Sequence, residues 1–447
     1  MANTRLTRTP SSAGSYVINT WSFWVKRGTL SSNQNLFNAY VSSSNKFRIK
    51  FTPSDQLEVG YFTGSWDFQI VTNRKFRDTS AWFHIVVAQK ANESTATDRI
   101  KVYVNGVRET SFATTNFPSA NEGSNVINAT NATQNIGSSG APDHYFDGSM
   151  SHVHFADGSA LAPTVFGETD STTGEWKIKT SPSFTLGTNG FTILKDGNTI
   201  TDQSANSNNF STSGAGVTTT KDCPSNVFAT LNPLIKFNSS YSVALSNGNT
   251  TLGTSTGSTN SNPTPTTFGI TTGKYYWETK FVSLASGTAY ALTGIMAQNP
   301  AGEGNYLGGY NDSYGYGSWN GVVYNNGGST GNTTGGATYG VGDILSMAFD
   351  ADNNRLYYYK NGAIQNSGTG IVIPAASTTV LGAWFPAVGD WGSTTHVWSC
   401  NFGNGFFGTT AVTTNSGNGY AGADGKSKFN YAVPSGYSAL STKGLNQ

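Results

Sequence analysis

Aromatic side chains in a glycine-rich stretch, residues 306–324, are the groups in this sequence best suited to binding chemistry. Exposed aromatic faces stack on sugar rings or on a partner's apolar surface, while Asn and Asp side chains supply hydrogen bonds to hydroxyl groups. Two further tryptophans lie in comparable predicted loops elsewhere in the chain. The predicted ligand-binding residues are Trp66, Tyr314, Tyr316, Trp319 and Trp391. In the alternative interpretation, most tyrosines of this stretch pack between sheets or in subunit contacts.

Two histidines at alternate positions, His152 and His154, are the residues whose spacing could bind a metal ion. Residues i and i+2 of a strand share a face, so both imidazoles could ligate one ion. Neither a cysteine nor another histidine stands at a spacing that is typical of a zinc site. A polar strand face without a metal is therefore the favoured interpretation.

The composition indicates which elements carry these residues. The chain has 447 residues with Gly 53, 13% aromatic and only 11% charged residues, against roughly 25% charged in an average soluble protein. The aromatic content excludes a disordered chain, and the scarcity of strong helix formers disfavours a helical bundle. The net charge of +1 provides no general attraction to nucleic acid or to anionic membranes. In residues 1–110, 14 Lys and Arg stand against 7 Asp and Glu, which we interpret mainly as solvated strand faces.

Short apolar and aromatic runs separated by turn residues predict an all-β protein. The dipeptides Asn105-Gly106 and Asn361-Gly362 each follow a run that contains tyrosine with valine or leucine. Each dipeptide predicts a tight hairpin turn. The spacing of the runs is typical of two-sheet sandwiches. We expect two β-sandwich (jelly-roll-like) domains, residues 1–165 and 233–447, joined by a polar bridge, residues 166–232.

The first half resembles the laminin-G-like, concanavalin-A-like lectin family in three motifs that occur in the family's order. These are residues 20–26 (TWSFWVK), the strand pair 80–87 (SAWFHIVV) and 99–106 (RIKVYVNG), and residues 146–155 (FDGSMSHVHF). Members of that family often bind calcium through Asp and carbonyl oxygens at the rim of the sandwich. The resemblance therefore implies Asp143, Asp147 and Asp157 as candidate calcium ligands, and we expect no other cofactor.

The second half resembles the SPRY family more sharply, and its last residues are expected to form a C-terminal tail strand. The matching motifs are residues 273–278 (GKYYWE), 341–344 (VGDI), 356–362 (LYYYKNG), 384–388 (WFPAV) and 401–403 (NFG). The tandem of the two domains looks like virion surface proteins of tailed bacteriophages, especially those that infect marine bacteria. This resemblance implies a structural or adhesive role on the tail or capsid.

Three functions follow from these observations as alternatives. We expect a non-enzymatic virion protein, a short tail appendage, fibre-like protein or capsid decoration, that recognises host glycan or a neighbouring virion protein through its loops. The second alternative is a purely structural assembly subunit without a receptor role. The third is a polysaccharide depolymerase, which the related β-glucanases suggest. Their Glu-x-Asp-x-x-Glu string does not occur here, and Glu168-Thr169-Asp170 is the nearest fragment.

The expected location is the virion, reached by cell lysis. The polar N-terminal sequence lacks the apolar stretch of a secretory signal, and no apolar run approaches the roughly 18 residues of a membrane span. We therefore expect synthesis in the host cytoplasm without membrane insertion or nucleic-acid binding. Virion symmetry makes a homo-oligomer the expected state, with a trimer as the first choice.

Overall fold

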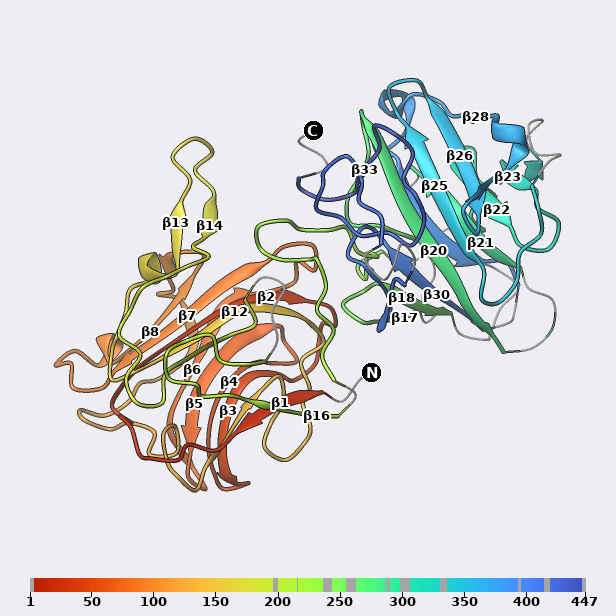
Figure 1. The fold of residues 1–447 in the computed structure, drawn as a ribbon. Coiled ribbons are helices and arrows are strands. Elements are labelled where there is room, and N and C mark those ends of the chain that lie inside the picture. The colour runs from red at the N-terminus through yellow and green to blue at the C-terminus, as the bar shows by residue number, and fades with distance from the viewer. Residues whose placement is uncertain are drawn as a thin grey trace. The chain divides into compact units, whose positions relative to one another are not determined.

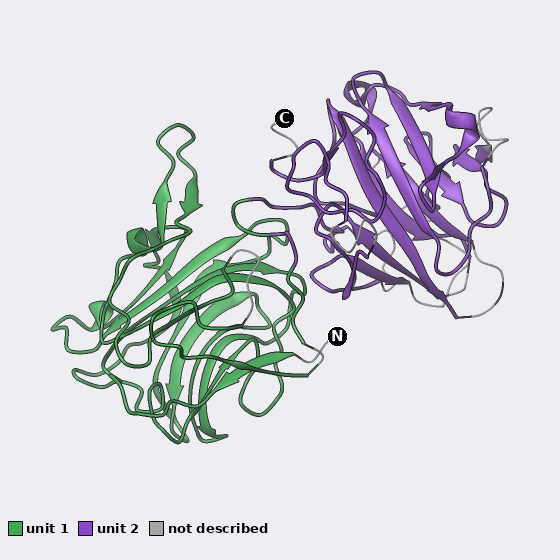
Figure 2. Ribbon diagram, viewed as in Figure 1, with its two compact units in different colours: residues 1–219, 223–225 green, residues 220–222, 226–447 purple. Residues whose placement is uncertain are grey.

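Strands are the main regular elements of the described residues, and the expected all-β fold class is confirmed (Figure 1). The computed structural model describes residues 4–195, 200–214, 216–235, 243–254, 263–285, 287, 290–297, 306–329, 336–392, 395–413 and 419–443. They form two compact units, residues 1–219 with 223–225 and residues 220–222 with 226–447 (Figure 2). Within the described residues the helices are single 3-10 turns: η1 (Ala96–Asp98), η2 (Pro163–Val165), η3 (Asn366–Gly368) and η4 (Ala376–Thr378). None of them is long and apolar enough to cross a membrane.

The first unit contains two large antiparallel sheets. In spatial order, the eight-stranded sheet consists of β10 (Phe112–Asn116), β6 (Trp66–Lys75), β5 (Gln56–Phe62), β4 (Asn45–Phe51), β3 (Gln34–Ser42), β11 (Thr133–Ile136), β1 (Arg5–Arg8) and β16 (Ser211–Ser213). The six-stranded sheet consists of β15 (Phe191–Ile193), β12 (Gly148–Asp157), β2 (Ile18–Arg27), β7 (Phe83–Lys90), β8 (Ile100–Val104) and β9 (Val107–Arg108). A separate hairpin, β13 (Gly167–Thr169) and β14 (Trp176–Ile178), projects from this unit in Figure 1.

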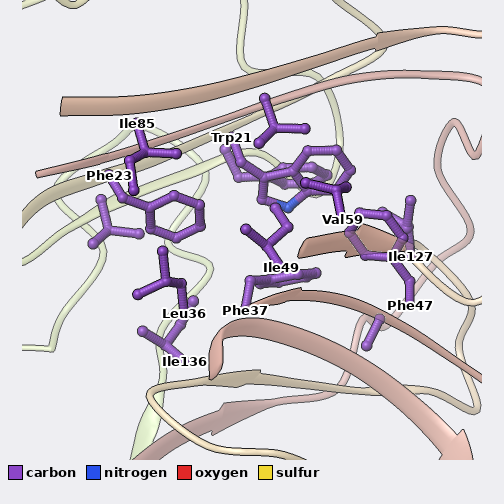
Figure 3. Close-up of a cluster of buried hydrophobic side chains, with 14 of the residues drawn as sticks. Trp21, Phe23, Leu36, Phe37, Phe47, Ile49, Val59, Ile85, Ile127 and Ile136 are labelled. Carbon is purple, nitrogen blue, oxygen red and sulfur yellow. The ribbon is translucent and has the colours of Figure 1, made fainter. Parts of the chain in front are cut away.

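Aromatic residues at alternate strand positions fill the space between these two sheets. Trp21 and Phe23 of β2 are fully buried, and Phe37 and Phe47 of the opposite sheet pack against Trp21 (Figure 3). The Trp21 ring stacks on Phe47 with a centroid distance of 4.9 Å. Since alternate residues of a strand point to opposite faces, the residues between these aromatic side chains lie on the outer faces of the two sheets.

Most of the expected polar bridge, residues 166–232, belongs to the same compact unit as residues 1–165. Strand β15 pairs with β12, and strand β16 pairs with β1. These short strands use backbone donors and acceptors that the edges of the two sheets would otherwise leave open. The sequence did not predict the pairing of β15 and β16, because a strand of three residues in a turn-rich segment shows almost no hydrophobic periodicity.

The second unit also contains two large sheets. The nine-stranded sheet consists of β17 (Val243–Ser246), β18 (Thr251–Thr254), β30 (His396–Asn401), β20 (Lys274–Leu284), β25 (Ile344–Asp350), β26 (Arg355–Lys360) and β27 (Ala363–Ile364), with β28 (Ile371–Val372) on β26 and β33 (Ser438–Ala439) on β20. The six-stranded sheet consists of β19 (Thr264–Pro265), β29 (Phe385–Asp390), β21 (Ala291–Met296), β22 (Ser313–Gly317), β23 (Val323–Asn325) and β24 (Gly328–Ser329). A two-stranded ribbon joins β31 (Phe406–Phe407) to β32 (Thr410–Ala411). Trp277, Trp384 and Trp398 are fully buried in the core of this unit.

Both expected Asn-Gly hairpin turns are confirmed. Asn105 and Gly106 have φ of 47° and 80°, and Asn361 and Gly362 have φ of 48° and 82°. Each asparagine also bonds the neighbouring strand. The Asn105 Oδ1 atom accepts from the His84 backbone N–H at 2.8 Å, and the Asn361 Oδ1 atom accepts from that of Ile344 at 2.9 Å. The asparagine thus both tolerates positive φ and anchors the turn to its sheet.

We expect Asn361→Ala to lower the free energy of unfolding of the second unit by about 2 kcal/mol. Alanine adopts positive φ at a cost of roughly 1 kcal/mol, and the side-chain bond to Ile344 adds about 1 kcal/mol. Urea unfolding measures the change. Asn361→Gly is the matched control. Glycine lacks the side-chain bond but adopts positive φ without strain, so Asn361→Gly should lower the free energy of unfolding less than Asn361→Ala does. Equal losses for the two variants would contradict this account.

Candidate functional site

Strand alternation decides which aromatic residues of the glycine-rich stretch are accessible. Tyr314 and Tyr316 of β22 point into the core between the sheets and are only 7% and 1% exposed. Tyr314 packs against Trp384 with a centroid distance of 5.7 Å, and Tyr316 lies 5.3 Å from the ring of Tyr358. The prediction that Tyr314 and Tyr316 offer exposed faces to a ligand was therefore wrong, because buried rings cannot stack on a molecule in solution.

The intervening glycines occupy the opposite face of β22, and an aromatic ring lies directly on one of them. Trp319 follows the strand, and its ring packs over Gly317. A Cβ atom at Gly317 would be 3.0 Å from the Trp319 ring and 3.2 Å from that of Tyr324. The rings of Trp319 and Tyr324 are stacked at 5.3 Å with an interplanar angle of 23°. The glycine thus leaves the room that the indole needs to lie close to the sheet.

Trp391 completes this group of rings from the far end of β29. Its centroid lies 5.0 Å from Tyr306, 5.4 Å from Tyr290 and 5.5 Å from Trp319. Tyr290 also contacts Trp319 at 5.2 Å, and Tyr306 contacts Tyr324 at 6.1 Å. We call this group the aromatic platform. Its members are Tyr290, Tyr306, Trp319, Tyr324 and Trp391.

The aromatic platform is both accessible and firmly supported. Trp391 is 38% exposed, and the other four rings are half-buried. Tyr306, Trp319 and Tyr324 pack against a small buried cluster on the outer face of the six-stranded sheet, made of Leu292, Met296, Leu307, Tyr310 and Ala387. Two hydrogen bonds hold members of the platform in place. The backbone N–H of Trp391 donates to the backbone carbonyl of Tyr290 at 2.8 Å, and the Asn320 Nδ2 atom donates to the Tyr324 hydroxyl at 2.6 Å.

The chemistry of the aromatic platform is that of stacking with neutral hydrogen bonding. The two tryptophans have no titratable group, and burial raises the pKa of the Tyr306 hydroxyl above its ordinary value. Aromatic faces bind the apolar faces of sugar rings, and the tyrosine hydroxyls with the Asn320 amide can bond sugar hydroxyls. A surface of clustered, rigid aromatic rings is also typical of a contact with a partner protein.

Two of the predicted ligand-binding residues, Trp319 and Trp391, come together in this platform although 72 positions separate them in the chain. Trp66 belongs to the first unit, where it is the first residue of β6 and not a loop residue. Tyr290 was missed by the sequence analysis. Its place, directly before an apolar strand, gives no sign that it meets Trp391 across the sheet.

The three aspartates proposed as calcium ligands do not form one site. Asp147 and Asp157 lie at opposite ends of β12, ten residues long, and so roughly 30 Å apart. Asp157 is buried and accepts from the backbone N–H of Ser15 at 2.8 Å and of Asn189 at 3.0 Å. Asp143 accepts from the nearby Ser139 hydroxyl, and Asp147 accepts from the hydroxyl of Thr29, which follows β2. In the part of the chain that the structure describes, no three His, Cys, Asp or Glu side chains are grouped to hold a metal ion.

Histidines on the outer face of the six-stranded sheet of the first unit are buried under aromatic rings. His84 lies between the rings of Trp24, at 4.7 Å, and Trp176 of β14, at 5.9 Å. The Trp176 Nε1 atom donates to His84 Nδ1 at 3.0 Å, and His84 Nε2 bonds the Ser22 hydroxyl at 2.9 Å. His154 bonds the Thr192 hydroxyl at 2.9 Å. The His152 ring lies beside that of His154 with a centroid distance of 6.2 Å, and its Nδ1 atom bonds the Ser151 hydroxyl at 2.7 Å.

Two sets of carboxylates are relevant to the hydrolase alternative. Glu168 and Asp170 lie on the exposed β13–β14 hairpin, and both pair with Lys177, at 3.4 and 3.2 Å. Glu278 of β20 is fully buried, and desolvation raises its pKa to about 7. Its two oxygens accept from the backbone N–H groups of Asn430 and Tyr431, both at 2.8 Å, so this carboxylate holds the C-terminal segment to the sheet.

The described residues form two β-sandwich modules, and the second module carries the aromatic platform. Comparison with protein families names both modules. Residues 5–165 match the concanavalin A-like lectin/glucanases superfamily, and residues 274–400 match the SPRY domain. The chain therefore carries a concanavalin A-like domain near its N-terminus and a SPRY domain in its second half, and both expected domain types are confirmed. Domains of these types suggest a carbohydrate- or protein-binding role.

Solved structures similar to this chain include three single domains. The SPRY domain of human HERC1 has 18% identity over 38% of this chain and 96% of its own, with a TM-score of 0.30. Another human SPRY domain has 19% identity over 36% of this chain and 96% of its own, with a TM-score of 0.29. Domain 4 of AbnA, a GH43 extracellular arabinanase from Geobacillus stearothermophilus in complex with arabinotriose, has 23% identity over 35% of this chain and 68% of its own, with a TM-score of 0.27. A search of curated proteins gives no match.

Proposed function

We propose that this chain is a non-enzymatic carbohydrate-binding protein whose ligand stacks on the aromatic platform. The observation that carries the proposal is the group of five mutually packed rings around Trp391, fixed on one face of the SPRY unit. Rigid aromatic rings lose little conformational entropy on binding, so the stacking free energy is retained as affinity. Uncharged rings with hydroxyl and amide groups at the edge suit a neutral glycan.

The tandem of a concanavalin A-like domain and a SPRY domain supports a place for this protein on the virion of a tailed bacteriophage, where the glycan would belong to the host surface. A homo-oligomer, with a trimer as first choice, would present several platforms at once and raise the avidity of the particle. The main alternative is an assembly subunit that covers the same platform with a neighbouring virion protein. Adhesion requires that the platform is not covered by another virion protein and that the purified chain binds glycan. Assembly requires that a neighbouring virion protein covers the platform.

A purely binding role agrees with the positions of the carboxylates. The Glu168 and Asp170 side chains share Lys177 on an exposed hairpin, and Glu278 is fully buried among the donors that it accepts from. We therefore propose binding without hydrolysis. Incubation with host polysaccharide should release no reducing ends, and release that a single carboxylate substitution abolishes would overturn this part of the proposal.

We expect Trp391→Ala to weaken binding to a neutral glycan at least tenfold, which is about 1.4 kcal/mol. Trp391 is the most exposed ring of the platform and contacts three of the other four, so its loss removes a stacking face and loosens its neighbours. A glycan array identifies a ligand, and isothermal titration calorimetry measures the affinity. Trp319→Ala should have a similar effect, because the indole rests on Gly317 next to Trp391.

Tyr16→Ala is the matched control, since it removes an exposed aromatic side chain of the other unit. It should bind the neutral glycan like the unaltered protein. If the platform variants keep full affinity while their melting temperatures are unchanged, the platform is not the glycan site. If the unaltered protein binds no glycan but associates with a virion protein through Trp391, the assembly alternative holds.

A further inference from the structure

Strand β4 presents a row of three cations on the outer face of the eight-stranded sheet. Lys46, Arg48 and Lys50 alternate with residues that face the core, so all three side chains lie on the face opposite to it. Their cross-strand partners on β5 are Phe62, Gly60 and Glu58. Three of the 14 basic residues of the first 110 therefore lie here in one ordered row.

The cations of this row exceed the acidic groups that face them. Glu58 serves two of them: its Oε1 atom lies 2.5 Å from Arg48 Nε and 3.9 Å from Lys50 Nζ. Lys50 is buried and also donates to the Asn33 amide oxygen at 2.7 Å. The Lys46 ammonium lies 5.7 Å from the centroid of Phe62, burial and the charge of Arg48 lower its pKa, and the carboxylate of Asp143 acts in the opposite direction. Three cations against Glu58 and Asp143 leave a positive charge on this face.

Trp66 places a half-buried indole next to the row of cations. Its ring lies across Gly60, where a Cβ atom would be 2.7 Å from the indole. The Arg48 guanidinium carbon lies over the Trp66 ring, 4.6 Å from its centroid, and the Phe62 and Trp66 rings meet edge to face at 5.3 Å. Arg48 thus joins the aromatic and cationic parts of the surface. The Gln69 amide, which donates to the Glu58 Oε2 atom at 3.1 Å, adds neutral hydrogen-bonding capacity beside them.

We propose that this face, defined by Lys46, Arg48, Lys50, Phe62 and Trp66, binds an acidic polysaccharide whose sugar rings carry carboxylate or sulfate groups. The sugar ring stacks on Trp66, and its acidic group pairs with Lys46 and with Arg48. This ligand differs in chemistry from the neutral glycan proposed for the aromatic platform. A nucleic acid also combines rings with negative charge, but sites for it extend several stacking residues along a basic groove. Here there is one indole, and the short row of three cations is partly neutralised by the carboxylate of Glu58.

Binding is tested with the full-length protein and three probes: oligogalacturonate for carboxylated sugars, chondroitin sulfate for sulfated sugars and dextran as the neutral reference. We expect oligogalacturonate or chondroitin sulfate to bind at least tenfold more tightly than dextran. The affinity should fall at least tenfold when NaCl rises from about 50 mM to about 500 mM, because exposed charge pairs are screened. The two acidic probes show which acidic group is preferred.

Lys46→Gln and Trp66→Ala should each weaken binding of the preferred acidic probe at least fivefold. Lys90→Gln is the matched charge control, because Lys90 is an exposed lysine of the six-stranded sheet. Trp391→Ala should bind the acidic probe normally, which separates this site from the platform. Equal affinity for dextran and both acidic probes, equal effects of Lys46→Gln and Lys90→Gln, or tighter binding of single-stranded DNA would each overturn the proposal. Lys46→Gln removes only a half-exposed charge, so it keeps the test valid if Trp66→Ala fails to fold.

Discussion

Lowering the pH from about 7 to about 5 is expected to reduce the free energy of unfolding of the N-terminal unit by about 4 kcal/mol. Burial lowers the pKa of His84 to about 3, and it lowers the pKa of His154 well below the ordinary 6.5. The unfolded chain binds these two protons below pH 6.5, and the native unit does not. Stability is therefore complete above the unfolded pKa and is lost as the pH falls toward the native one, at about 1.4 kcal/mol per histidine and pH unit.

The hydrogen bonds of His84 explain why the native unit resists protonation. An indole N–H can only donate, so the bond from Trp176 requires a bare Nδ1 atom on His84. The proton of the neutral ring then lies on Nε2 and is donated to the Ser22 hydroxyl. A proton on Nδ1 would break the bond to Trp176 and place a charge between two indoles. The β13–β14 hairpin, which carries Trp176, should be the first part of the unit that acid releases.

Urea unfolding at several pH values between 5 and 7 measures this effect, and hydrogen exchange assigns it to peptides of the first unit. The slope should be about 2.7 kcal/mol per pH unit with both histidines and about half of that in His84→Phe. The substitution also leaves Trp176 and Ser22 without their partner, but that loss is independent of pH and does not affect the slope. A slope that His84→Phe leaves unchanged would contradict the assignment.

Replacing Glu278 by glutamine is expected to destabilise the second unit by about 3 kcal/mol and to free the C-terminal segment. The carboxylate accepts from four donors, two of which are the backbone N–H groups of Asn430 and Tyr431. The others are the Asn401 amide at 3.1 Å and the Tyr276 hydroxyl at 3.2 Å. Glutamine turns one acceptor oxygen into a donor, so two donors face each other in a site without water access. Faster hydrogen exchange over residues 420–441 should accompany the loss.

The pH dependence of Glu278 has the opposite sign to that of the histidines. Desolvation raises its pKa from 4.5 to about 7, so the native unit binds this proton more readily than the unfolded chain. The resulting stabilisation is complete below pH 4.5 and is lost as the pH rises through 7, by about 1.4 kcal/mol per pH unit. As the pH falls from about 7 to about 5, the second unit should therefore gain stability from Glu278 while the first unit loses stability. Glu278→Gln should abolish this gain.

Asp352→Asn is the matched control for Glu278→Gln. Asp352 is an exposed carboxylate of the same unit that accepts from the Gly273 N–H at 2.8 Å, and the asparagine oxygen can keep that bond. Its effect on stability should stay below about 0.5 kcal/mol. If Glu278→Gln is equally mild, the buried carboxylate does not hold the C-terminal segment.

The sequence was sufficient to predict features that depend on neighbouring residues. The Asn105-Gly106 and Asn361-Gly362 turns were predicted because positive φ is a property of two adjacent residues. The strands around Trp21 and Trp277 were predicted because a period of two is visible along the chain. The two domain types followed from motifs made of such strands and turns.

The tertiary structure alone decided which faces are buried and which distant side chains meet. The alternation Tyr314-Gly315-Tyr316-Gly317 is visible in the sequence, but only packing against the other sheet turns the tyrosines inward and leaves the glycines beneath Trp319. The same packing joins Tyr290 to Trp391 across the sheet.

The sequence by itself therefore determined an all-β chain of two recognisable sandwich domains, rich in aromatic residues suited to binding. It did so because strand period, turn chemistry and composition are local properties of the chain. The tertiary structure decided that Trp319 and Trp391 share a platform, that Tyr314 and Tyr316 do not belong to it, and that Asp147 and Asp157 lie too far apart to bind one ion. Strand order and register make these decisions, because they bring residues together without regard to their separation along the chain.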